Sequence, residues 1–157
     1  MNEGAIRVGA FAGVLVLMAV TEVAAPRRQA GPLRIQRWPV NLALVALSSV
    51  VIRIVTPVGL TGIAAAVGLL GWGVLPRLGL PPAATAIAAF VALDLMVYLQ
   101  HRLTHAVPLL WRLHRIHHSD LVMDTTTGVR FHPLEILVSF GLKALAVAIL
   151  GASPAVV

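Results

Sequence analysis

Long apolar runs separated by short polar segments constrain the fold of this chain more than any other feature. A membrane-crossing helix needs roughly twenty apolar residues to cover about 30 Å of hydrocarbon. Four runs approach or reach that length, over about 5–25, 38–55, 83–100 and 134–157. Charged residues make up 11% of the chain, against about a quarter in soluble domains. We therefore expect an all-α protein, a multi-pass bundle that forms a single membrane-embedded unit over 1–157.

Clusters of arginine at the ends of these runs indicate the topology. The segment 26–38 has no acid and carries four arginines, Arg27, Arg28, Arg34 and Arg37. Such a bias is typical of a cytoplasmic loop. The segment 101–133 carries four more, Arg102, Arg112, Arg115 and Arg130. If both segments face the cytoplasm, an even number of crossings separates them. We therefore interpret the glycine-rich run 57–76 as interfacial or re-entrant.

The charge and cysteine content exclude several classes of function. The net charge of +6 and the pI near 11.6 would suit nucleic acid, but the arginines flank apolar runs and do not alternate with aromatic residues. We expect no nucleic-acid partner. Without cysteine, the chain has neither disulfides nor thiolate metal sites. The first run could be a cleaved signal peptide, but its length and the lack of a basic leading region favour a spanning helix.

All six histidines lie between His101 and His132. Asp94, Tyr98, His101 and His105 are spaced by four, three and four residues, which places them on one face of a helix. An i, i+4 histidine pair on such a face can bind a single metal ion. Asp94 lies deeper in the apolar run and needs a partner there, such as a ligating imidazole from another helix.

A second histidine group follows Pro108, which is suited to begin a new helix. His114 and His118 form another i, i+4 pair, and His117 lies about a turn from His114. Neutral imidazole binds iron, zinc, copper or nickel without adding charge at a membrane boundary. We therefore interpret 101–133 as a histidine-rich metal-site segment.

Other readings of the histidines remain open. Each one alone is typical of an amphipathic surface residue, and a pH-sensing patch would also collect imidazoles. Two bis-histidine haems would need ligands on facing helices. The chain lacks the glutamate of the HExxH motif that a zinc hydrolase of that type requires. A non-catalytic membrane protein that binds a metal for structure or sensing is the main alternative to an enzyme.

Three linked elements resemble the fatty acid hydroxylase / sterol desaturase superfamily of membrane-bound di-iron oxygenases. They are "DLMVYLQHRLTH" (94–105), "LLWRLHRIHHSD" (109–120) and "TTTGVRFHPLE" (125–135). The resemblance implies a cytoplasmic-facing cap of histidines that holds two iron ions, with zinc as an adventitious metal. Its ligands would be the six histidines, His101, His105, His114, His117, His118 and His132. Asp94, Arg130 and Glu135 would support them, with no catalytic residue beyond the metal ligands.

The resemblance also implies an activity and its partners. The protein would use O2 to hydroxylate or desaturate a C–H bond of a sterol or fatty acyl lipid. Electrons would come from a cytochrome b5-like or ferredoxin-type protein, since the chain has no flavin or NAD fingerprint. Abundant arginine, alanine and glycine suggest a GC-rich bacterial genome, so we expect the protein in a bacterial cytoplasmic membrane with its histidines facing the cytoplasm. The family's further C-terminal histidine box is missing, so we expect a truncated chain, and an inactive pseudoenzyme is an alternative.

Overall fold

The computed structural model describes residues 3–26, 34–120 and 122–157, and these contain helices and no strand. The α-helices are α1 (Glu3–Ala24), α2 (Arg34–Val55), α3 (Gly59–Leu69), α4 (Pro82–Ala106), α5 (Pro108–His118) and α6 (Pro133–Leu150). Two 3-10 helices, η1 (Leu75–Leu78) and η2 (Thr125–Val129), lie in connections. The segments long and apolar enough to cross a membrane are Gly4–Ala24, Arg34–Leu69, Pro82–Ala106 and Pro133–Leu150. The predicted all-α architecture with spanning helices is confirmed.

Both α4 and α5 begin at a proline, and the second proline sets the turn between the two helices. Pro82 begins α4, where its missing N–H costs nothing. Val107 has an extended backbone (φ −96°, ψ 118°), as expected for a residue that precedes proline. Pro108 then begins α5, so the chain turns sharply between the two helices. The turn brings the second histidine group next to the first.

A close contact between two glycines ends α6. The helix stops at Leu150, short of the predicted span to residue 157, because Gly151 adopts a left-handed conformation (φ 68°). A Cβ atom on Gly73 (φ 118°) would lie 2.3 Å from the Gly151 Cα atom. The N–H of Val74 also donates to the carbonyl of Ile149 at 2.9 Å. The connection after α3 therefore packs directly on the end of α6.

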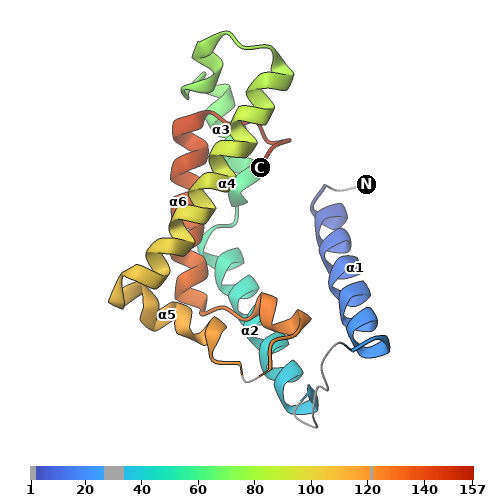
Figure 1. Ribbon diagram of the computed structural model, residues 1–157. Helices are drawn as coiled ribbons and strands as arrows, with labels where there is room; N and C mark the ends of the chain where they lie inside the picture. Colours follow the sequence, from blue (N-terminus) through green and yellow to red (C-terminus); the bar gives the residue numbers. More distant parts are fainter. Residues whose placement is uncertain (1–2, 27–33, 121) are drawn as a thin grey trace.

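Helix α6 is the centre of the bundle and packs against α2, α3, α4 and α5. Figure 1 shows α3 continuing from α2 along α6, after a break at residues 56–58, while α4 returns beside them. The run 57–76 thus contains a helix that lies beside α6, and its interfacial or re-entrant character stays a prediction. Helix α1 stands aside in Figure 1. Its two ends are joined to the rest by Arg7, which donates to the Pro154 carbonyl, and by Glu22, which accepts from Thr125.

Small residues fill the contacts between helices, whereas large apolar side chains point outward. Ala64, Ala89 and Val147 are each 1% exposed. Ile87 and Phe90 on α4 are 65% and 64% exposed. This distribution suits helices surrounded by lipid, where small residues allow close helix packing and apolar side chains face hydrocarbon. Together with the four long apolar segments, it indicates an integral membrane protein.

Candidate metal centre

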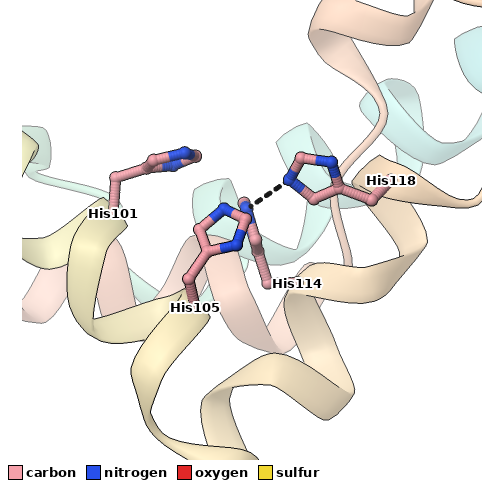
Figure 2. A group of neighbouring side chains, drawn as sticks. All are labelled: His101, His105, His114 and His118. Carbon is pink, nitrogen blue, oxygen red and sulfur yellow. Dashed lines mark hydrogen bonds between the residues drawn. The ribbon is translucent and has the colours of Figure 1, made fainter.

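Two histidine pairs from adjacent helices meet in one cluster. His101 and His105 extend from α4, and His114 and His118 extend from α5 (Figure 2). One ring nitrogen from each of the four lies within 4.8 Å of the others. Because each pair has i, i+4 spacing, its rings lie one turn apart on the same helix face. The sharp turn at Val107 and Pro108 brings the two faces together. We call these four residues the histidine cluster.

The distances between the ring nitrogens are close to those between ligand atoms around a single metal ion. The Nε2 atoms of His114 and His118 are 3.2 Å apart. Two imidazole nitrogens at about 2.1 Å from one tetrahedral ion would be about 3.4 Å apart, and about 4.2 Å apart on opposite sides of it. The widest separation in the histidine cluster, up to 4.8 Å, needs a small inward closure of side chains. The cluster therefore fits one first-row transition metal ion.

A buried carboxylate orients the innermost histidine. His114 is 1% exposed, and its Nδ1 atom lies 2.6 Å from Oε1 of Glu135, at the start of α6. A carboxylate accepts hydrogen bonds, so the proton of neutral His114 lies on Nδ1. The Nε2 lone pair is then free to bind a metal. Such a carboxylate–histidine pair is typical of metal sites, where it fixes both tautomer and ring orientation.

The electrostatics of the histidine cluster favour neutral imidazoles. Burial and the neighbouring His101 and His105 lower the pKa of His114 to about 4. Burial and the adjacent His117 and His114 also lower the pKa of His118. Imidazole must be deprotonated to bind a metal. At neutral pH the second pair is therefore ready to bind without first losing protons.

An indole ring packs against the histidine cluster. Trp111 lies 5.3 Å from His105 and 5.7 Å from His118, measured between ring centroids. His101, His105 and His118 are themselves exposed, so the cluster remains accessible from one side. The sequence analysis did not single out Trp111. Its position three residues before His114 was the available signal, because that spacing places it beside the histidine face of α5.

The other two predicted ligands lie outside this cluster. His117 lies beside the cluster, with its ring centroid 5.0 Å from that of His118, and it stacks on Phe131, with ring centroids 4.7 Å apart and an angle of 3° between the planes. His132 is the N-cap of α6, where its Nδ1 accepts from the N–H of Leu134 at 3.1 Å. The structure thus brings together four of the six predicted ligands. Their role as ligands stays a prediction.

The three predicted supporting residues have different positions. Glu135 contacts His114 as described above. Asp94 lines a pocket deeper along α4, and its side chain forms no hydrogen bond or ion pair with any residue that the structure describes. The side chain of Arg130 donates to Asn41 Oδ1 at 3.1 Å and to Ser119 Oγ at 3.0 Å. Only Glu135 therefore contacts an imidazole of the histidine cluster through its side chain.

A buried polar network ties the segment after α5 to the start of α2, and the sequence analysis did not find it. We call it the Arg37 network; its members are Arg37, Trp38, Asn41, Asp120, Asp124, Thr126, Thr127 and Arg130. Arg37 donates to both aspartates and to the Val122 carbonyl. The hydrogen bond from Arg37 holds the pKa of Asp120 well below its usual range. Burial raises the pKa of Asp124, but hydrogen bonds from Thr126 and Trp38 outweigh that effect.

The Arg37 network also bears on topology. Arg37 belongs to the first predicted arginine cluster, and its partners belong to the histidine-rich segment. These two parts of the chain therefore lie at the same end of the bundle, as the even number of crossings requires. Arg27 and Arg28 lie outside the described residues. The assignment of this end to the cytoplasm stays a prediction.

Residues 86–157 match the family model named Fatty acid hydroxylase. The matched segment contains α4, α5, η2 and α6, and hence both histidine pairs and Glu135. No solved structure matches the chain. The part of the chain that carries the histidine cluster therefore matches the fatty acid hydroxylase family model, which is consistent with the superfamily that the three sequence elements resemble.

Proposed function

We propose that this protein is a membrane-embedded, iron-dependent oxygenase that hydroxylates or desaturates a lipid C–H bond. The convergence of two i, i+4 histidine pairs, within a segment that matches the fatty acid hydroxylase model, carries the proposal. His101, His105, His114 and His118 are the proposed ligands. Iron bound there would supply the activation of O2 that an unreactive C–H bond requires.

The protein's own residues prepare this site in three ways. Glu135 holds the proton of His114 on Nδ1 and leaves Nε2 for the metal. Trp111 packs beside two ligand rings and limits the approach of water from that side. The apolar helices α4 and α6 extend from the cluster into the bundle, so a lipid chain can approach from the surrounding hydrocarbon.

The histidine cluster alone provides four nitrogen donors, which suffice for one ion. The two iron ions that the resemblance implies would need further donors. The proposed electron donor is a separate redox protein, of the cytochrome b5 or ferredoxin type. The exposed rings of His101, His105 and His118 leave one side of the site open to such a partner.

Metal content and turnover of the purified full chain test the proposal together. After anaerobic loading with iron, His114→Ala and His118→Ala should lose bound iron, whereas His132→Asn should retain it. With O2, a chemical or protein reductant and membrane lipid extract, the wild type should form hydroxylated or desaturated lipid, detected by mass spectrometry. A wild type that retains no iron would overturn the metal centre. Retained iron without lipid oxidation would favour a non-catalytic metal-binding protein.

A further inference from the structure

A small cavity lies where α4, α5 and α6 meet, and the carboxylate that contacts His114 lines it. The volume of this cavity is about 30 Å³. Its polar lining consists of Gln100 and Thr104 of α4 and Glu135 of α6, and no histidine takes part. The rest of its wall is formed by apolar side chains, those of Leu103, Leu110, Leu113, Val138 and Leu142. We call this space the Glu135 cavity.

One oxygen of the Glu135 carboxylate has no hydrogen-bond partner in the part of the chain that the structure describes. Oε1 lies 2.6 Å from Nδ1 of His114, so that oxygen is engaged. The other oxygen, Oε2, is buried and forms no hydrogen bond. Glu135 as a whole is 7% exposed. Because a buried carboxylate oxygen without a hydrogen bond is costly, Oε2 calls for a donor from within the cavity.

The polar neighbours of the cavity offer a donor and an acceptor. Ser139 lies one turn after Glu135 on α6, and its hydroxyl donates to Oε1 of Gln100 at 3.2 Å. That bond uses the acceptor of the Gln100 amide and leaves its two N–H donors free. Thr104 is buried, and its hydroxyl donates to the His101 carbonyl at 2.7 Å. The Thr104 oxygen can still accept a hydrogen bond.

A water molecule matches both the size and the polar groups of the Glu135 cavity. About 10–15 Å³ of such space holds one water, so 30 Å³ suffices for one or two. A water here can accept from Gln100 and donate to Glu135 and Thr104. These three hydrogen bonds are the number that a buried water typically makes. A lipid chain is too large for the space and would leave Oε2 without a donor.

We infer that the Glu135 cavity binds a structural water, and that Gln100 is a positioning residue that acts on Glu135 through this water. In extending this role to metal binding, the inference rests on the proposed function. Rotation about the last torsion of a glutamate side chain is soft, so the contact with His114 alone does not fix the carboxylate plane. The water supplies the second contact. Oε1 then stays directed at Nδ1 of His114, and Nε2 stays available to the metal.

A double-mutant cycle on iron(II) affinity tests the role of Gln100. Gln100→Met keeps the length of the side chain and removes its N–H donors. In the wild-type background this change should weaken iron(II) binding about three- to tenfold, less than the roughly 10- to 100-fold typical for loss of a direct partner of a ligand. In the Glu135→Leu background it should change the affinity by less than about twofold, because the carboxylate on which Gln100 acts is gone.

Anaerobic titration of the full chain against a coloured chelator measures these affinities. Gln36→Met is the matched control, since Gln36 is exposed on α2 and does not line the cavity. It should bind iron(II) as the wild type does. An equal loss of affinity from Gln100→Met in both backgrounds would show that Gln100 acts through packing alone and would overturn its positioning role.

An electron-density map of the wild type locates the water directly and does not depend on bound iron. At a resolution of about 2 Å it should show a water within about 3.2 Å of both Glu135 Oε2 and Gln100 Nε2. A map with no water there, or with Oε2 bonded directly to a protein group, would contradict the inference even if iron is retained. A water at this position in a wild type that retains no iron supports the cavity and overturns the metal centre alone.

Discussion

Replacing Glu135 with leucine should weaken metal binding by removing the group that sets the tautomer of His114. Without the carboxylate, an N–H on Nδ1 would be buried and unsatisfied, at a cost of about 1–3 kcal/mol. The proton would instead move to Nε2, where it can donate to His118 Nε2 at 3.2 Å. That arrangement blocks the atom that should bind the metal. Loss of such an orienting partner typically costs about 10- to 100-fold in metal affinity, or about 1.4–2.7 kcal/mol.

The structure places the expected loss near the upper end of this range. His114 and Glu135 are 1% and 7% exposed, and their 2.6 Å contact is a short, charge-assisted hydrogen bond. Glu135→Gln should lose less than about tenfold, because its amide oxygen can still accept from Nδ1. Anaerobic titration of iron(II) against a coloured chelator measures both affinities, with Glu22→Leu as a carboxylate control away from the cluster. Equal affinities for the leucine variant, the glutamine variant and the wild type would refute the orienting role.

Three further predictions concern stability. Because burial and neighbouring imidazoles lower the pKa of His114 to about 4, the metal-free protein should be equally stable above about pH 6.5 and lose stability as the pH falls towards 4. The unfolded chain takes up a proton there that the folded chain does not, so thermal unfolding against pH should show a slope that His114→Asn flattens. His132→Ala should keep the metal but lose about 0.5–2 kcal/mol of stability, because the N-cap of α6 is removed. His132→Asn should restore that stability, since asparagine is a good N-cap. Loss of metal from the alanine variant would instead show that His132 is a ligand. Gly73→Ala should destabilise far more than Gly71→Ala, because its Cβ would meet Gly151 at 2.3 Å whereas the Cβ at position 71 meets nothing within 4 Å; equal unfolding temperatures would contradict this.

Local spacing allowed the histidine cluster to be predicted from the sequence. An i, i+4 pair fixes its own geometry as soon as the helix forms. The proline at position 108 indicated a new helix after the first pair, and the structure places the two pairs face to face there. Glu135 was predicted only as a supporting residue near a helix start. Its contact with His114 depends on how α6 packs against α5, which sequence spacing does not specify.

The same reasoning could not tell which of the six histidines the fold brings into one cluster. His117 and His132 are close to the cluster in sequence, yet one stacks on Phe131 and the other caps α6. For His117, the helix places neighbouring side chains on different faces, so the adjacent His118 is the one whose ring lies beside His105 of α4. For His132, the backbone N–H groups at the start of α6 need an acceptor, and the imidazole provides one. The position of each histidine therefore depends on which partners lie within reach of its own side chain.

The Arg37 network helps the histidine cluster to keep its geometry across the connection between α5 and α6. The described part of this connection contains the short helix η2, and α6 presents Glu135 to His114 at 2.6 Å. Asp120 lies two residues after the end of α5, and Asp124 is the N-cap of η2, so both aspartates lie in the first part of that connection. Arg37 binds both, which holds the connection against α2. Breaking a buried ion pair by removing one partner costs about 3–5 kcal/mol. The position of Glu135 against His114 therefore depends on an arginine that precedes it by almost a hundred residues, and a sequence pattern confined to the histidine boxes could not reveal that dependence.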